Sequence, residues 1–204
     1  MPLRVPPGRA GRPWLLHRLE VARAGADVLE EKRRALLRRR DQLALEEAEA
    51  RLEWERLAQE AVTSHHRALV LSGARRLRLA AFYGGGRADV RVQYRNLLGV
   101  TLPDSAQVDF TEPVDLVPLG VTLPLALAAG IHRQALAAAA RYASAREAHR
   151  RVSEECRSTA RRLRAIEQRW IPRHEEALAR LELTLDELER EDSGRVRWFQ
   201  GRPA

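Results

Sequence analysis

Cysteine, lysine and aromatic side chains are all scarce in this chain of 204 residues. The single cysteine, Cys156, excludes an internal disulfide and fits a reducing compartment. No run of about 18 apolar residues occurs, so the sequence predicts no membrane-spanning helix. The N-terminal residues also lack the apolar segment of a secretion signal. From these absences we expect a cytoplasmic protein without direct membrane insertion.

Charge is abundant, and it is mostly carried by arginine. Charged residues make up 31% of the chain and aromatic residues 5%, which is the profile of long helices with a thin core. Lys32 is the only lysine among 36 basic residues, a bias that we attribute to coding composition rather than to any one contact. Residues 1–40 carry eleven basic and four acidic side chains. Such an end suits either nucleic acid or an acidic protein surface, and composition does not decide between them.

The second half of the chain carries the clearest periodic pattern. Twelve positions follow an unbroken 4-3 spacing: Ile131, Ala135, Ala138, Tyr142, Ala145, His149, Val152, Cys156, Thr159, Leu163, Ile166 and Trp170. A sustained period of about 3.5 residues keeps one stripe of a helix against a partner helix. Beyond Pro172 the stripe resumes with a small phase shift and includes Leu181 and Leu185. This half therefore predicts one partner of a coiled coil.

The first third of the chain carries a matching stripe. A seven-residue repeat places these residues on one row: Leu15, Ala22, Leu29, Leu36, Leu43, Ala50, Leu57, Ser64 and Leu71. A companion row is interrupted by charges, so we expect Leu37, Leu45 and Leu52 to take over as the stripe drifts round the helix. A helix over residues 14–71 would be roughly 85 Å long, and we expect it to lie against an equally long neighbour.

Residues 84–120 interrupt the helical pattern. Three glycines at 84–86 predict a hinge. Residues 90–95 alternate apolar with polar side chains, as in a half-buried strand, and residues 107–111 predict a returning strand. The turn-forming residues 103–105 place the connection between them. A lone hairpin is marginally stable, so we expect this one to pack against the helices.

Together these patterns predict a mainly α fold: a long antiparallel two-helix coiled coil with a small insert, made of a short helix and a β-hairpin, at the bend. We expect one elongated domain. Its predicted segments are an irregular tail (1–13), a long helix (14–73), the insert (74–121), a second long helix (122–193) and a C-terminal tail (194–204). Thr122 is the expected N-cap of the second helix. Pro172 within it should remove one backbone hydrogen bond and bend it.

No spacing typical of a catalytic or metal site stands out. His65 and His66 are adjacent, so they face different sides of one helix and suit a solvated surface better than a metal. His149 and Cys156 share the apolar stripe one heptad apart, which favours packing over shared metal binding. The glycines at 84–86 lack the Gly-Lys-Ser/Thr ending of a phosphate-binding loop. We expect no catalytic residue, metal or cofactor.

Three motifs in the chain resemble one known family. The most specific lies in the second helix and comprises Arg161, Arg162, Ala165, Glu167, Ile171 and Pro172. Another follows Leu185 and comprises Glu189, Arg190, Glu191, Asp192, Arg195, Val196 and Arg197. A third lies near the start and comprises Leu19, Ala22, Gly25, Leu29, Lys32, Arg33 and Leu36. In their spacing and their order along the chain, the three motifs resemble the D subunit of the V-type and A-type rotary ATPases, the axle of the central stalk. The chain departs from that pattern at Gly194, where the family usually has Phe, and at Gly11-Arg12-Pro13, which interrupts what is normally early helix.

The resemblance implies a rotor subunit with no active site of its own. The paired helix ends would sit inside a hexamer of alternating A and B subunits, which bind nucleotide. The bend would point toward the membrane, near the F subunit and the funnel-like C subunit on the membrane rotor ring. Rotation would couple proton or sodium flow to ATP synthesis or hydrolysis, and the protein would be peripheral to the cell membrane.

The residues expected to contact partners are Arg9, Arg12, Arg18, Arg23, Arg161, Arg162, Glu167, Pro172, Glu189, Arg190, Glu191, Arg195 and Arg197. Arginines near the helix ends would meet acidic loops that line the bore, and each exposed pair would contribute about 0–1 kcal/mol. Weak pairs of this kind can break and form again at every step of rotation.

One alternative belongs to a different class. A coiled-coil scaffold or nucleic-acid-binding protein could use the same arginine-rich helix ends on phosphates. The axle interpretation requires no nucleic acid as a partner. Salt-dependent retention of the purified protein on DNA would distinguish the two.

Overall fold

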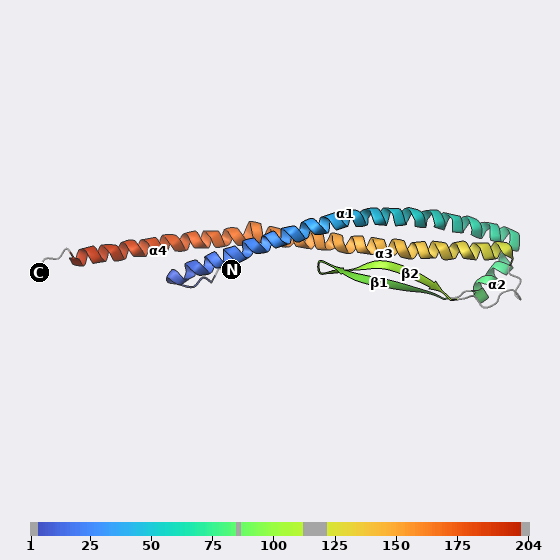
Figure 1. The fold of residues 1–204 in the computed structure, drawn as a ribbon, viewed down its shortest axis with the longest axis horizontal. Coiled ribbons are helices and arrows are strands. Elements are labelled where there is room, and N and C mark those ends of the chain that lie inside the picture. The colour runs from blue at the N-terminus through green and yellow to red at the C-terminus, as the bar shows by residue number, and fades with distance from the viewer. Residues whose placement is uncertain (1–3, 85–86, 112–121, 201–204) are drawn as a thin grey trace. The chain divides into compact units, whose positions relative to one another are not determined.

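The computed structural model describes residues 4–84, 87–111 and 122–200. Its elements are a 3-10 turn (Gly8–Ala10), α1 (Gly11–Ser72), α2 (Ala74–Gly84), β1 (Ala88–Leu97), β2 (Val100–Phe110), α3 (Leu123–Ala165), a π-helical segment (Ile166–Trp170) and α4 (Ile171–Gln200) (Figure 1). The predicted fold class is confirmed, because paired antiparallel helices dominate and a two-stranded antiparallel sheet lies between them in the chain. The predicted hinge at 84–86 lies largely outside the described residues, as does the end of the insert up to residue 121.

The chain divides into two compact units. Unit 1 comprises Met1–Arg34 and Arg157–Ala204, and unit 2 comprises Ala35–Cys156. Unit 1 therefore combines the start of α1 with the end of α3, the π-helical segment and α4. Unit 2 combines the rest of α1 with α2, the hairpin and the start of α3.

In unit 2, α1 and α3 pack against each other in opposite directions. Three buried clusters join them, and their members are Leu36 and Leu43 with Ala148, Val152 and Cys156; Leu57 and Ala61 with Ala135 and Ala138; and Ala68 with Leu125 and Ala128. Residue numbers rise along α1 while they fall along α3, as an antiparallel pair requires. Fully burying a leucine side chain contributes about 1.5–3 kcal/mol, so these clusters supply much of the pairing energy.

The seam between α1 and α3 differs from the predicted one at three leucines. Leu45 and Leu52 are 68% and 67% exposed, and Leu71 is 71% exposed. The companion row keeps its place instead, with Ala61 and Ala68 buried. Near the end of α1 the buried position is Ser72, one residue beyond Leu71. A helix with 3.6 residues per turn drifts relative to a strict seven-residue repeat, and this drift moves the last inward position from 71 to 72.

The hairpin forms, but its turn is not at residues 103–105 as predicted. Leu97 pairs with Val100, and the two-residue turn between them is Leu98-Gly99, with φ of 53° and 84°. Asn96 supports the turn, since its Oδ1 accepts a hydrogen bond of 3.0 Å from the backbone N–H of Gly99. Positive φ at both central residues matches the type I′ turns that suit twisted strands.

The residues predicted as the turn form a bulge within β2. Gln93 pairs with Ser105 and Tyr94 pairs with Pro103, so Asp104 is one extra residue between them. The sequence signal was real but ambiguous, because proline and aspartate occur in bulges as well as in turns. In unit 2 the hairpin lies beside α3 (Figure 1), and Leu102 is completely buried in the same cluster as Leu36 and Val152.

In unit 1, the start of α1 runs antiparallel to α4. Arg12 and Arg23 of α1 lie 3.0 and 2.6 Å from Glu182 and Glu175 of α4. Arg9, in the 3-10 turn before α1, lies 3.1 Å from Glu189 of α4. Gly11-Arg12-Pro13 does not break the helix, because α1 begins at Gly11 and Pro13 lies in its first turn, where its missing N–H costs nothing. Gly194 likewise lies within α4, which runs on to Gln200.

Pro172 follows directly after the π-helical segment Ile166–Trp170. Proline lacks an N–H and its ring collides with the carbonyl four residues earlier in a regular α-helix. A π-helical turn contains an extra residue and shifts the hydrogen-bonding register, which accommodates the proline without ending the helix. The predicted long second helix is therefore divided into α3, this turn and α4.

Candidate functional site

No constellation suited to catalysis or metal binding emerges from the part of the chain that the structure describes. Over those residues no group of three histidine, cysteine or carboxylate side chains is placed to hold a metal ion. Within the same residues, no helix is both long and apolar enough to cross a membrane. The candidate functional features are the side chains that the paired helices hold together and those that they present outward.

Polar and aromatic side chains reinforce the helix seam in unit 2. Trp54 of α1 stacks on Tyr142 of α3, with ring centroids 5.4 Å apart and an interplanar angle of 9°. Farther along the seam, the Nδ1 atom of His149 lies 2.6 Å from a carboxylate oxygen of Glu47. Flat stacking of large rings fills a wide stretch of the seam, and such pairs contribute about 0.5–1.5 kcal/mol beyond their buried area. The seam in unit 2 is therefore specific as well as apolar.

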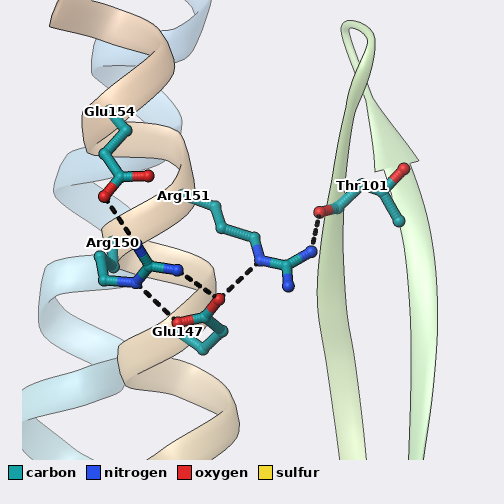
Figure 2. Close-up of polar contacts among 5 residues, drawn as sticks. All are labelled: Thr101, Glu147, Arg150, Arg151 and Glu154. Atoms are coloured by element: carbon teal, nitrogen blue, oxygen red, sulfur yellow. Dashed lines mark hydrogen bonds and ion pairs between the residues drawn. The ribbon is translucent and has the colours of Figure 1, made fainter.

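An arginine–glutamate network connects α3 to the hairpin (Figure 2). Glu147 accepts hydrogen bonds of 2.7 Å from both Arg150 and Arg151, and Arg150 also donates to Glu154 at 2.6 Å. Arg151 then donates from its other end to the backbone carbonyl of Thr101 in β2, at 2.8 Å. A single guanidinium thus joins a helix side chain to a strand backbone, which aligns the hairpin along α3.

The network favours the charged form of its central carboxylate. Hydrogen bonds from Arg150 and Arg151 lower the pKa of Glu147 from 4.5 to about 2. The hydrogen bond with Glu147 also raises the pKa of Arg150 above its ordinary value. Both groups therefore stay charged at neutral pH, and the link between α3 and β2 is insensitive to small changes of pH. The guanidinium of Arg151 also lies 5.9 Å from the centre of the Tyr94 ring, within range of a cation–π contact.

A stack of rings and one guanidinium surrounds the π-helical segment in unit 1. The Arg18 guanidinium carbon lies 4.7 Å from the Trp14 ring centre and 6.0 Å from that of Trp170. The Trp170 ring in turn stacks on His174 at 3.5 Å. The Nδ1 atom of His174, a residue that is 4% exposed, lies 2.8 Å from the backbone carbonyl of Trp170. This stack anchors the π-helical segment against α1, and no periodic pattern pointed to His174.

The structure places several predicted partner-contacting residues in contacts within the chain. Arg9, Arg12 and Arg23 are engaged by glutamates of α4, and the partner of Arg9 is the predicted residue Glu189. Arg195 lies 3.7 Å from the predicted residue Glu191 and 4.0 Å from Asp192. Arg197 donates to the carbonyl of Ser193 at 3.4 Å. These arginines make contacts within the chain, so a partner subunit would have to compete with those contacts to bind them.

Other predicted residues are presented outward or half-buried. Arg161, Arg162, Glu167 and Arg190 are exposed, and within the described residues none of them lies in an ion pair; Pro172 is half-buried. Among the predicted seam residues, Leu15, Leu36, Leu43, Leu57, Val152 and Leu163 are buried, whereas Leu29, Tyr142, Ile166, Trp170, Leu181 and Leu185 are half-buried. Leu71 faces solvent.

Sequence reasoning missed two groups of residues. The first joins the hairpin to α3 and includes Arg151 and Leu102, whose partners depend on a turn that was placed incorrectly. The second comprises exposed arginines beside the most specific motif: Arg157, Arg164, Arg169 and Arg173. A signal for this second group was available, because Arg157, Arg161 and Arg164 repeat with a 4-3 spacing out of phase with the apolar stripe.

Known proteins of similar sequence match nearly the whole chain. A family model that describes the D subunit of ATP synthase matches residues 15–201. The A-type ATP synthase D subunit of Pyrococcus horikoshii is 30% identical over 198 residues, which cover 96% of this chain and 92% of that protein. The V-type ATP synthase D subunit of Anaeromyxobacter sp. strain Fw109-5 is 31% identical over 203 residues, covering 98% and 94%. The V-type ATP synthase D subunit of Thermus thermophilus is 28% identical over 184 residues, covering 90% and 82%.

Proposed function

Because this chain belongs to the family of ATP synthase D subunits, we propose that it is a non-catalytic rotor subunit in the central stalk of a V/A-type ATPase. In this role it transmits torque between the nucleotide-binding hexamer and the membrane ring. Rotation then couples ATP synthesis or hydrolysis to the transport of protons or sodium ions. The protein is peripheral to the membrane as part of that complex.

The observation that carries the proposal is the way the helices pair within each unit. In unit 2, buried clusters and the stacked rings of Trp54 and Tyr142 resist sliding of α1 against α3. In unit 1, three arginine–glutamate pairs and the stack around Trp170 join the 3-10 turn and α1 to α4. Close-packed helical pairs transmit strain because their side chains have few alternative arrangements. That is the mechanical property a torque-bearing element requires.

The proposed partners follow from the family. The A and B subunits would surround the paired helix ends, and the F subunit and a funnel-like C subunit would bind nearer the membrane. Exposed charges at Arg161, Arg162, Glu167 and Arg190 are available for such contacts. Contacts between exposed charges are worth about 0–1 kcal/mol each, so a rotor can exchange them without being trapped in one position.

A coupling measurement tests the mechanical role. In the reconstituted complex, Leu163→Gly combined with Ile166→Gly removes two inward side chains and loosens the seam. We expect ATP hydrolysis to continue while ATP-driven ion pumping falls at least tenfold. The control combines Ala165→Gly with Gln168→Gly, which adds the same backbone freedom at exposed neighbouring positions and should preserve pumping.

Two results would count against the proposal. Wild-type pumping by the seam variant would remove the mechanical role that we assign to the helix pair. A tagged chain that co-purifies with neither nucleotide-binding subunit would contradict membership of the stalk itself. If that chain were instead retained on DNA in a salt-dependent manner, the nucleic-acid-binding alternative would replace it.

A further inference from the structure

Unit 1 carries a concentration of exposed arginines, of which the proposed function names only Arg161 and Arg162 as available for partner contacts. Between residues 157 and 173 there are six arginines and a single acidic residue, Glu167. All six are exposed, and within the described residues none of them lies in an ion pair. Other arginines of unit 1 behave differently, since Arg9, Arg12 and Arg23 each engage a glutamate of α4.

Three of these arginines lie on the outward face of α3. Successive residues of an α-helix are about 100° apart, so Arg157, Arg161 and Arg164, spaced by four and three, share one face. Thr159 and Leu163, which are 0% and 6% exposed, lie about 200° and 240° round the helix from Arg157. The arginine face is therefore opposite to the buried face of the helix.

The π-helical segment brings two more arginines onto the same face. In a regular α-helix Arg169, five residues after Arg164, would be rotated by about 140° and would leave the stripe. A π-helical turn hydrogen-bonds residues five apart, so position 169 follows position 164 roughly as the fourth residue on does in an α-helix, and stays on the same side. Arg173 follows Arg169 by four residues and stays on that side, while His174 next to it is buried.

We propose that Arg157, Arg161, Arg164, Arg169 and Arg173 form one continuous cationic stripe, aligned by the π-helical turn, that docks against an acidic surface of the nucleotide-binding hexamer. The stripe spans about 24 Å, at about 1.5 Å per residue. The inference rests on the proposed function, because that function places the paired helix ends inside the hexamer.

The charge distribution favours carboxylates of a protein over phosphates of nucleic acid. A nucleic-acid backbone that continued past either end of the stripe would bring its phosphates against side chains of like charge. Exposed acids flank it, since Glu154 precedes it and Glu175 and Glu176 follow it. An acidic helix or loop can lie along the stripe and avoid these flanking carboxylates. Such a contact also speeds association through electrostatic steering and weakens with added salt.

Binding of the full-length chain to the purified hexamer of A and B subunits tests the stripe. The first variant combines Arg157→Gln, Arg161→Gln and Arg164→Gln, and the second combines Arg169→Gln and Arg173→Gln. A matched control removes three exposed arginines of unit 2 with Arg75→Gln, Arg76→Gln and Arg146→Gln. Affinity is measured by biolayer interferometry from 50 to 300 mM NaCl, and circular dichroism verifies that each variant remains helical.

We expect the first variant to bind about tenfold more weakly and with a shallower salt dependence, given about 0–1 kcal/mol per exposed pair and 1.4 kcal/mol per tenfold. The second variant should lose affinity severalfold, and the affinity of the control should stay within twofold of wild type.

If the first variant binds within twofold of wild type, the stripe has no docking role, although the proposed function stands. Loss in the first variant alone refutes the alignment by the π-helical turn. Absence of wild-type binding would instead contradict the proposed function, and loss of DNA retention without loss of hexamer affinity would assign the stripe to nucleic acid.

Discussion

Unit 2 and unit 1 hold their helices together by different means. In unit 2, apolar side chains from α1 and α3 form three buried clusters, and in one of these the hairpin contributes the fully buried Leu102. In unit 1, Leu15 and Leu19 are also buried, but the contacts that the 3-10 turn and α1 make with α4 include arginine–glutamate pairs whose side chains are 43–81% exposed. Exposed pairs contribute about 0–1 kcal/mol each, far less than a buried leucine.

Unit 2 is therefore suited to holding its helices rigidly together, and unit 1 to presenting side chains at the surface. A third element packed on a helix pair buries surface that two helices alone leave in water, so unit 2 can resist deformation. Unit 1 keeps more of its side chains at the surface, and its outward face carries the arginine stripe. The comparison makes four predictions, from the largest expected effect to the smallest.

Matched cavities in the two units test the comparison most strongly. Leu36 and Leu15 are both 0% exposed, and each is replaced by alanine. Leu36→Ala should cost about 3–5 kcal/mol, because its cluster is supported from three elements and collapses poorly, and Leu15→Ala about 2–3 kcal/mol. Hydrogen exchange should show lost protection at residues 88–110 for Leu36→Ala only. Equal loss throughout the chain for both variants would erase the distinction between the units.

Crowding at the start of α1 provides the second test. A Cβ added to Gly11 would lie 2.5 Å from the Pro6 carbonyl oxygen and 2.9 Å from Leu181 Cδ2. Gly11→Ala should therefore cost about 1–3 kcal/mol in unit 1 through overpacking. The control is Gly25→Ala in the same helix, where an added Cβ would meet no atom within 4 Å apart from the backbone of its own helix turn; it should stabilise by about 0.5–1 kcal/mol. Thermal unfolding measures both changes. An unchanged stability of Gly11→Ala would show that the segment around Pro6 moves aside to accommodate the added methyl group.

Acid should loosen the hairpin in unit 2. The pKa of Glu147 is lowered to about 2, so the folded state favours the charged carboxylate. The resulting stability is present in full above about pH 4.5 and is lost as the pH falls toward 2. Because the side chain is 33% exposed, we expect a loss of up to about 1 kcal/mol. Amide exchange at residues 94–102 between pH 5 and pH 2 measures it, with Glu147→Gln lacking this pH-dependent part. Identical pH profiles for both proteins would exclude a role for the network.

The hairpin turn offers the smallest effect, and it is a gain. Leu98 adopts a φ of 53°, a conformation that favours asparagine or glycine over leucine. Leu98→Asn creates the Asn-Gly pair preferred in type I′ turns and should stabilise the hairpin by about 0.5–1 kcal/mol. The change should slow amide exchange in β1 and β2 and leave unit 1 unaffected. Leu98→Ala serves as a control that removes the side chain but keeps the unfavourable φ.

Periodicity predicted the helices because their inward positions are set by geometry alone. Burial of Leu36, Leu43, Val152 and Leu163 follows directly from the 4-3 spacing. The errors at Leu45, Leu52 and Leu71 arose where a strict heptad and a helix of 3.6 residues per turn diverge. Small residues at Ala61 and Ala68 allow close approach, and a count of large apolar residues overlooks them.

The position of the hairpin turn and the extent of the arginine stripe could not be predicted from the sequence, for different reasons. The turn at Leu98-Gly99 contains a leucine in a conformation that leucine seldom adopts, so Gly99 is its one clear turn-forming residue and the signal is weak. Arg169 and Arg173 join the stripe only through a π-helical turn, and no propensity of single residues predicts such a turn. Several residues predicted to contact partners instead pair with residues far away in the chain, as Arg9 does with Glu189, and the sequence alone does not reveal such pairs.

The extra residue Asp104 in β2 has a consequence for the way the hairpin sits on its support. Neighbouring residues of a regular strand point to opposite sides, yet Leu102 and Pro103 are both buried. A bulge sharpens the right-handed twist locally, so the sheet can turn a different side toward the helices at its tip than at its base. Without Asp104 the sheet would lose this local twist. It could then keep either Leu102 buried at its tip or Phe110 beside Arg133 at its base, but not both.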